Sequence, residues 1–482
     1  MAYNQVTPEI IAQLEKIAPG RVITGTDINP DYGRDEMPIY GTRMPDVAID
    51  VLTTEEVSEI MKLCYANNIP VTTRGAGTGL VGGAVPMMGG VVICTSKMNQ
   101  ILSWNDEHFG VVIQPGVILQ DLQQAALKRG LMYPPDPGNK LSTVGGNVST
   151  NAGGMRAIKY GTTKTYVRGM TVVLPDGRIL KIGENVEKTS MGYNIVQLIT
   201  GSEGTLGVIT ELVLKLIKAP KIAISVLAPF EELNTALQAV PKVFQSSFRP
   251  TALEFFERDI LIMSEEYIGK AVWPRDIKGT PIQAYLLMIF DGETMDELDP
   301  ILEKLTDFML EQGAMDVMIA DTPTKIKDIW DARGVFLDVI FESARLYDEN
   351  DVVVPINRIA EFVKFFWDEA KQYDFGVNYL GHAGDGNLHI FAVSNDMDEE
   401  EFKVQVAKWM TSMYQKAKEL KGELTGEHGV GGGKVEYFQE YVGDIAYELH
   451  RQIKLAFDPK NILNPGKVCF SYEELGLAPA NV

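Results

Sequence analysis

Residues 74–82 read Arg-Gly-Ala-Gly-Thr-Gly-Leu-Val-Gly and directly follow an apolar stretch that predicts a strand. Two more glycine-rich stretches come later, PPDPGNKLSTVGGNVSTNAGG at 134–154 and GSEGTLGVITE at 201–211. Glycine permits positive φ, and successive backbone N–H groups in such loops can cradle an anion. A single loop of this kind is more often a tight turn. Three of them indicate an extended polar ligand such as a dinucleotide.

The first loop also contains the spacing Gly77-x-Gly79-x-x-Gly82, which matches the fingerprint of nicotinamide-binding folds. That fingerprint is weak unless a helix opens at the glycines. Here the next residues are Gly-Ala-Val-Pro-Met-Met-Gly-Gly, a poor helix start. A nicotinamide-binding fold is therefore the least favoured interpretation, although the loop can still hold phosphate.

The pattern around these loops predicts an α+β protein rather than a regular alternation of strand and helix. Helices are expected at 6–17, 54–67 and 119–129. Strands are expected at VAIDVL, PVTT, GVVICTS, FGVVIQPG and MTVVLPDGRILKI, and later at 222–228, 283–290 and 352–355.

A chain of 482 residues is too long for one hydrophobic core. Glycine becomes sparser after Pro220 and returns near Gly422. We therefore expect three segments. Residues 1–219 carry an N-terminal helix and the glycine-rich domain, 220–421 form a second domain, and 422–482 return to the first.

The formal charge of −21 argues against binding to nucleic acid or to anionic membrane surfaces. The three cysteines lie far apart without a CxxC pair, so no iron–sulfur or zinc-thiolate cluster is expected. The N-terminal stretch lacks the apolar core of a signal peptide, and no apolar run approaches bilayer-spanning length. These features predict a cytoplasmic protein.

Three of the five histidines fall in two short motifs, NYLGHAGDGNLHIF at 378–391 and GEHG at 426–429. In the first motif, a turn sequence between two apolar runs predicts a hairpin with His382 and His389 at one end. Two imidazoles and a carboxylate can form an open metal site. The spacing alone is equally consistent with histidines that cap the hairpin through hydrogen bonds.

The order RGAGTG, PDPGNxxxTVGGNxxxNAGG and GSEGTLGVIT resembles the FAD domain of the vanillyl-alcohol-oxidase-type flavoproteins. Within that family it is most similar to the branch of glycolate oxidase, D-lactate dehydrogenase and D-2-hydroxyglutarate dehydrogenase, from about residue 45 to about residue 470. The resemblance implies a two-subdomain PCMH-type FAD-binding domain and an α+β cap domain with an antiparallel sheet.

By this resemblance, residues in or near the three glycine-rich stretches and Asn464 bind FAD. Thr78 and Leu141 stand where some relatives carry the histidine and cysteine that attach FAD covalently, so the flavin is expected to be noncovalent. The expected FAD-binding residues are Arg74, Gly75, Ala76, Gly77, Thr78, Gly79, Pro137, Gly138, Thr143, Gly145, Gly146, Asn151, Gly153, Gly154, Gly161, Gly204, Gly207, Ile209 and Asn464.

The same resemblance implies that His382, His389 and Glu427 hold one divalent metal, which can be zinc, iron or manganese. It leaves His428 as the base that removes the substrate hydroxyl proton, a task suited to an imidazole near neutral pH. The flavin would accept the hydride from C2 of a 2-hydroxy acid.

Arg333, in IWDARGVF, matches the region of the family's substrate arginine, and the alternative is a surface arginine on an amphipathic helix. The stretch Asp348-Glu349-Asn350-Asp351 stands where the hydroxyglutarate enzymes carry a lysine. A second substrate carboxylate would meet acidic residues there. We therefore expect a small monocarboxylate, lactate first and glycolate second. The D configuration follows from the resemblance alone.

The expected activity is oxidation of D-lactate to pyruvate, with an electron-transferring flavoprotein as the acceptor that the resemblance suggests. The cysteines cannot form a relay, and no strongly basic amphipathic segment suggests docking to a membrane. The alternatives are an oxidase that passes electrons to oxygen and a noncatalytic FAD-binding subunit of a larger complex. The intact histidine motifs argue against the second.

Overall fold

The computed structural model describes residues 3–320 and 322–476. It divides into two compact units. Unit 1 comprises Met1–Gly153, Thr162–Ala219 and Glu427–Val482, and unit 2 comprises Gly154–Gly161 and Pro220–Gly426. Residues 1–2 and 477–482, at the ends of the first and third expected segments, lie outside the described residues.

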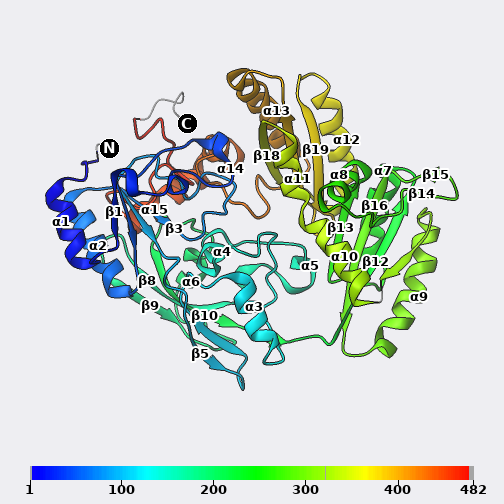
Figure 1. Ribbon diagram of the computed structural model, residues 1–482, viewed down its shortest axis with the longest axis horizontal. Helices are drawn as coiled ribbons and strands as arrows, with labels where there is room; N and C mark the ends of the chain where they lie inside the picture. The colour runs from blue at the N-terminus through cyan, green and yellow to red at the C-terminus, as the bar shows by residue number, and fades with distance from the viewer. Residues whose placement is uncertain (1–2, 321, 477–482) are drawn as a thin grey trace. The chain divides into compact units, whose positions relative to one another are not determined.

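Unit 1 contains two principal sheets with helices packed on them (Figure 1). Its helices are α1 (Pro8–Ile17), α2 (Thr54–Asn67), α3 (Leu119–Leu127), α4 (Val144–Thr150), α6 (Ile195–Ile199), α14 (Val435–Val442) and α15 (Asp444–Phe457). Its strands are β1 (Val22–Thr24), β2 (Val47–Asp50), β3 (Val71–Arg74), β4 (Val91–Cys94), β5 (Ile101–Asn105), β6 (Gly110–Ile113), β7 (Leu131–Met132), β8 (Val167–Val173), β9 (Ile179–Gly183), β10 (Val208–Lys215) and β11 (Ile217–Lys218).

The smaller sheet of unit 1 has the order β1-β2-β4-β3, and the larger, antiparallel sheet has the order β5-β6-β10-β8-β9. Strands β2, β4 and β3 run parallel, so the segment after β3 leaves from the same sheet edge as the segments after β2 and β4. Helix α2 begins where Thr53 accepts a hydrogen bond from the Glu56 N–H and ends at Asn68 in the left-handed conformation. Its apolar face joins the core between the two sheets.

Unit 2 is one seven-stranded sheet with helices on both faces, and its strand order is β17-β12-β16-β13-β19-β20-β18. Its strands are β12 (Ile222–Phe230), β13 (Ala252–Glu257), β14 (Asp276–Ile277), β15 (Thr280–Pro281), β16 (Ala284–Gly292), β17 (Met318–Ala320), β18 (Leu346–Val353), β19 (Gly376–His382) and β20 (Asn387–Ser394). Its helices are α5 (Ala157–Tyr160), α7 (Leu233–Gln245), α8 (Arg258–Ile268), α9 (Met295–Glu311), α10 (Pro323–Gly334), α11 (Phe336–Ser343), α12 (Ile359–Ala370) and α13 (Glu399–Glu419).

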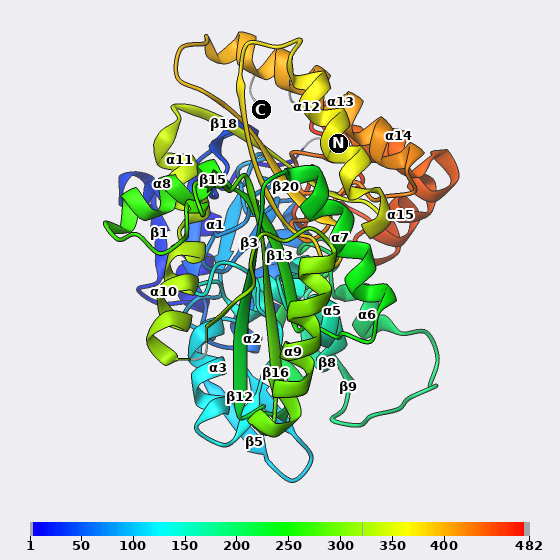
Figure 2. The same cartoon turned by 90° about the vertical axis from the view of Figure 1, so that its right-hand side faces the viewer.

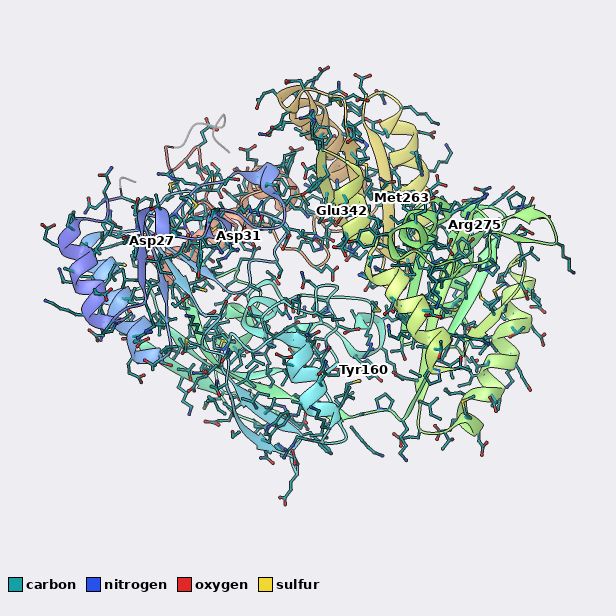
Figure 3. All side chains as sticks on the ribbon, in the orientation of Figure 1. Asp27, Asp31, Tyr160, Met263, Arg275 and Glu342 are labelled. Atoms are coloured by element: carbon teal, nitrogen blue, oxygen red, sulfur yellow. The ribbon has the colours of Figure 1, made fainter. Side chains whose placement is uncertain are left out.

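The two faces of this sheet have different coverings (Figure 2). Helices α7, α9, α12 and α13 pack on one face. Helices α8, α10 and α11 pack on the other, around a core that includes Phe256, Leu380 and Phe391. Met263 of α8 and Glu342 of α11, both labelled in Figure 3, mark the helices of this second face.

Residues 154–161 belong to unit 2 although the chain before and after them belongs to unit 1. The Tyr160 hydroxyl (Figure 3) donates to Asp291 Oδ2 at 2.8 Å, and Lys159 pairs with the same carboxylate. The Ile158 side chain lies close to Gly384: a Cβ added to Gly384 would come within 2.9 Å of it. The short helix α5 is thus attached to the sheet beside the β19–β20 turn.

The mixed α+β class and the antiparallel sheet are confirmed. The largest difference from the sequence prediction is β18, which begins at Leu346 and not at 352. It therefore includes the acidic stretch 348–351, which sequence reasoning did not place in a strand. Partners satisfy Glu349 and Asp351, whereas the Asn350 amide atoms are buried with no hydrogen-bond partner among the described residues.

Candidate active site

The expected hairpin is present, and its register brings the two histidines together. His382 ends β19 opposite Asn387, and His389 on β20 pairs with Leu380. Directly opposed residues of an antiparallel pair point to the same face, so both imidazoles lie on the face that α8, α10 and α11 cover. Their ring centroids are 5.2 Å apart, and a ring nitrogen of one lies within 4.8 Å of a ring nitrogen of the other.

Each histidine has its Nδ1 held by a buried carboxylate. His382 Nδ1 lies 2.6 Å from Glu254 Oε1, and His389 Nδ1 lies 2.8 Å from Glu349 Oε1. A carboxylate on Nδ1 fixes the ring orientation and the tautomer, and metal-ligating histidines usually have such a partner. Nε2 is then the nitrogen with which each ring would coordinate a metal. This arrangement fits a metal better than histidines that only cap the turn.

Glu254 also binds Arg333, on the last turn of α10. Arg333 Nη2 lies 2.9 Å from Glu254 Oε2, and its side chain is 12% exposed. It is therefore not a solvated surface arginine. Burial alone would raise the pKa of Glu254, but His382 and Arg333 outweigh that effect and hold the pKa below its ordinary value. The carboxylate is thus shared between the Arg333 guanidinium and the His382 ring.

Asp351 ties the hairpin to the end of unit 2. Its Oδ1 accepts from Asn387 Nδ2 at 2.6 Å. Its Oδ2 accepts from the Thr425 hydroxyl at 2.6 Å and from the Gly426 N–H at 3.1 Å. The chain therefore leaves unit 2 from a point anchored beside the hairpin. The next residue, Glu427, is the first of unit 1.

Glu427 and His428 are held by unit 1. The Glu427 side chain lies against Gly153, where an added Cβ would come within 2.9 Å of Glu427 Oε2. His428 Nε2 is 3.7 Å from Glu427 Oε1. Glycine at 153 is thus required by the approach of this carboxylate.

The glycine-rich segments converge within unit 1, as the resemblance implied. A Cβ on Gly75 would overlap Thr143, which joins the first loop to the second, and one on Gly204 would lie 2.5 Å from Thr73 Oγ1. Asn464 Nδ2 donates to Gly83 O and Glu203 O, bridging the first and third loops. The three glycine-rich loops and Asn464 thus meet near the end of β3.

The remaining expected FAD-binding residues have mixed placements. Gly145 packs against Pro115 and Gly207 against Val172, which are contacts within the fold. Gly154 and Gly161 fall in unit 2. Gly138 has open space around its Cα, and Ile209 is buried in β10.

Buried polar atoms near the converging loops fit a polar ligand. Asn464 Oδ1, Asn147 Nδ2 and Asp35 Oδ2 are buried and have no hydrogen-bond partner among the described residues. Such atoms are costly unless something satisfies them. At Gly77, φ is +78° and the Arg74 guanidinium occupies the place of a Cβ, so only glycine fits this turn of the loop.

Sequence reasoning missed Glu254, and it named Glu349 and Asp351 only as acidic residues near the substrate, not as the residues that hold His389 and the chain after the hairpin. Glu254 had a recognisable signal, because it is a single carboxylate within the apolar strand sequence ALEFFE. The roles of Glu349 and Asp351 depend on strand pairing between segments far apart in the chain, which the sequence does not show.

Comparison with known proteins gives consistent matches over nearly the whole chain. A family described as "FAD linked oxidases, C-terminal domain" matches residues 219–468, and a "FAD binding domain" matches residues 45–183. A D-lactate dehydrogenase of Anaerostipes hadrus is 52% identical over 97% of this chain and 98% of its own. Glycolate oxidase subunit GlcD of Bacillus subtilis (strain 168) is 36% identical over 93% and 92%.

A D-2-hydroxyglutarate dehydrogenase of Stutzerimonas stutzeri is 31% identical over 96% of this chain and 99% of its own. Among solved structures, p-cresol methylhydroxylase with substrate bound superposes with a TM-score of 0.79 at 17% identity, covering 98% and 99% of the two chains. That likeness shows a shared fold. Among residues 3–320 and 322–476, no helix has the length and apolarity needed to cross a membrane.

Proposed function

The chain belongs to the FAD-linked oxidases, and from this premise we propose that it oxidises D-lactate to pyruvate. The family resemblance and the FAD cofactor that it implied are thereby confirmed. The enzyme class, an FAD-dependent hydroxy-acid dehydrogenase, follows from the same matches. D-lactate is the proposed substrate because the relative that is 52% identical is a D-lactate dehydrogenase.

The strongest support from the molecule itself is the histidine pair with its two carboxylates. Glu254 and Glu349 orient His382 and His389 for a metal, and Glu427 follows Gly426, which Asp351 anchors beside the hairpin. Consecutive Cα atoms are about 3.8 Å apart, so the chain itself limits how far Glu427 can lie from Gly426. We therefore propose His382, His389 and Glu427 as ligands of one divalent metal.

The chain's own residues would perform the remaining tasks. His428 would take the hydroxyl proton from the substrate as general base. Arg333 would bind the substrate carboxylate through the donors that Glu254 does not use. When bound, FAD supplies the acceptor of the C2 hydride and the metal supplies a Lewis acid for the hydroxyl.

The acidic stretch supports a monocarboxylate. Glu349 and Asp351 lie on the same face as the histidines, and both carboxylates are used in holding them and the chain that follows. A second carboxylate on the substrate would meet these anions and would have to overcome their repulsion. Lactate fits this environment better than 2-hydroxyglutarate.

In this proposal unit 1 binds FAD and unit 2 supplies most of the substrate site. Thr78 and Leu141 replace the covalent anchors of some relatives, so the FAD is noncovalent and should leave the protein on acid precipitation.

An electron-transferring flavoprotein is the proposed acceptor. Lactate-dependent NAD reduction should then be slow with the isolated chain and fast with that carrier. Equal rates in both mixtures would exclude this acceptor.

The deciding experiment is anaerobic flavin bleaching with matched pairs of D- and L-hydroxy acids. We expect D-lactate to bleach the flavin fastest, with D-2-hydroxyglutarate and L-lactate much slower. Faster bleaching by glycolate than by D-lactate would favour glycolate as the substrate. Stoichiometric formation of peroxide under air would favour an oxidase. If no acid changed the flavin spectrum, the result would favour a noncatalytic FAD-binding subunit.

A further inference from the structure

Glu203, in the third glycine-rich loop, binds the backbone that follows the histidine of the GEHG motif. Its Oε1 accepts the Val430 N–H at 2.8 Å, and its Oε2 accepts the Gly431 N–H at 2.7 Å. Charge-assisted hydrogen bonds of this kind are stronger than neutral ones. Because each oxygen takes a different N–H, the carboxylate fixes the orientation of the peptides as well as their position.

The backbone of Glu203 is held as firmly as its side chain. Its φ is +53°, a left-handed conformation that side-chain-bearing residues seldom adopt. Its N–H donates to Ser149 O at 2.7 Å, and its carbonyl accepts from Asn464 Nδ2 at 2.8 Å. A strained residue of this kind persists only where surrounding contacts enforce it, and such residues concentrate at functional sites.

The opposite side of the contact is shaped for this carboxylate. Gly429 has a φ of +91°, and an added Cβ there would lie 2.8 Å from Glu203 Cδ. The carboxylate therefore occupies the space that a side chain at 429 would fill. The same segment is in contact with Gly153 through Glu427, two residues before Gly429. Within unit 1, residues 427–431 are thus bounded by Gly153 at one end and by Glu203 at the other.

We propose that Glu203 is a positioning residue that directs His428 toward the substrate by fixing the peptides of Val430 and Gly431. The inference rests on the proposed function, in which His428 takes the hydroxyl proton. His428 lies two residues before the first fixed N–H, so a shift of this backbone moves the imidazole with it. A misplacement of about 1 Å can slow a reaction by roughly 10²-fold.

The test is the rate of anaerobic flavin reduction by D-lactate in four proteins: the unchanged chain, Glu203→Gln, His428→Asn and the double variant. The amide introduced by Glu203→Gln keeps one acceptor but turns an NH₂ group toward the other backbone N–H. The matched control is Glu211→Gln, on β10 of the same unit, where Glu211 Oε2 accepts from the Thr171 hydroxyl at 2.9 Å. FAD content and melting temperature are measured for every protein.

We expect Glu203→Gln to slow reduction by roughly 10–10²-fold while its FAD content matches that of Glu211→Gln. We expect His428→Asn to slow it by roughly 10²–10⁴-fold. If Glu203 acts through His428, adding Glu203→Gln to His428→Asn should slow the reaction little further, by about 3-fold or less. Glu203→Asp keeps the charge on a shorter side chain and should give an intermediate rate. It replaces Glu203→Gln in the cycle if that variant does not bind FAD.

The outcomes separate this inference from the proposed function. A normal rate in Glu203→Gln beside a slow His428→Asn overturns the positioning role and leaves the base in place. Fully additive effects, or a loss of FAD in both Glu203 variants but not in Glu211→Gln, also overturn it, because Glu203 would then act on the fold. A nearly normal His428→Asn refutes the proposed base itself.

Discussion

In the β19–β20 hairpin, the groups that can perform chemistry are the two histidine side chains, and a second side chain holds each of them. The loops at 74–79, 143–154 and 201–207 are instead rich in glycine, and we expect their backbone N–H groups to bind the ligand. His382 is oriented by Glu254 within a regular sheet. Gly77 is oriented by the turn itself, with the Arg74 guanidinium beneath it. The hairpin depends on partners brought from distant strands, whereas the loops depend on local conformation.

This difference predicts that the two regions fail in different ways. A substitution in the hairpin should remove metal or catalysis and leave the FAD in place. A substitution in the loops should weaken FAD binding and leave the proposed metal site at the hairpin unchanged. Measuring FAD and metal content together in each variant therefore tests the comparison directly.

The largest effect is expected from His382→Ala. We expect metal content to fall from about one ion per chain to little, and flavin reduction to slow by roughly 10²–10⁴-fold, because a Lewis-acid metal contributes several kcal/mol to charge stabilisation. Elemental analysis and stopped-flow absorbance measure the two quantities. The control is His450→Ala, an exposed histidine on α15. Unchanged metal content in His382→Ala would rule out this ligand set.

The next effect concerns two glutamates of β13. Glu254→Gln should weaken metal affinity by roughly 10–100-fold, because its carboxylate fixes the His382 ring. Glu257 lies on the opposite face of the same strand, where the Tyr379 hydroxyl donates to it, so Glu257→Gln should keep its metal. Competition with a chelator measures both affinities. Equal affinities in the two variants would contradict the role given to Glu254.

A smaller effect is expected from Gly77→Ala in the first loop. Alanine at this positive φ costs about 1–2 kcal/mol, and its Cβ would also displace the Arg74 guanidinium, so FAD affinity should fall by about 10-fold or more. Gly279→Ala, in the β14–β15 turn, has a φ of +86° and open space around it. It carries a similar backbone penalty away from the loops. FAD titration of the apoprotein compares them, and similar FAD affinities in both variants would show that the loop effect is only general destabilisation.

The smallest effect is a pH dependence of stability. Burial raises the pKa of Glu257 to about 7, although the Tyr379 hydrogen bond lowers it. The folded chain therefore keeps a proton that the unfolded chain loses above about pH 4.5. This contribution to stability is full below that pH and is lost as pH rises through about 7. The melting temperature of Glu257→Gln, relative to the unchanged chain, should rise by roughly 2 °C or more between pH 5 and pH 8. Parallel melting curves across this range would contradict it.

Local signals explain why much of the site could be predicted. The glycine spacing, the Ala-Gly-Asp-Gly-Asn turn and the GEHG motif are each contained in a few consecutive residues, so they are visible without knowledge of the fold. The hairpin and the facing histidines were predicted correctly for this reason. Helix α2 has the bounds that were predicted, Thr54–Asn67.

Contacts between distant segments explain what could not be predicted. Glu254 and His382 are separated by 128 residues, Glu349 and His389 by 40, and Glu203 and Val430 by 227. Nothing in the local pattern of β18 predicted a strand through four polar residues. That strand is stable because Asn387 and His389 of β20 satisfy Asp351 and Glu349.

The sequence by itself determined the α+β fold, the glycine-rich loops and the histidine hairpin, because glycine conformation, turn chemistry and strand periodicity are properties of short segments. The FAD cofactor and the candidate metal ligands followed from the family resemblance of those motifs. Only the tertiary structure decided which carboxylate orients which histidine and which loop binds the backbone N–H groups after His428. Those choices depend on sheet order and register, which are set by the packing of the whole core.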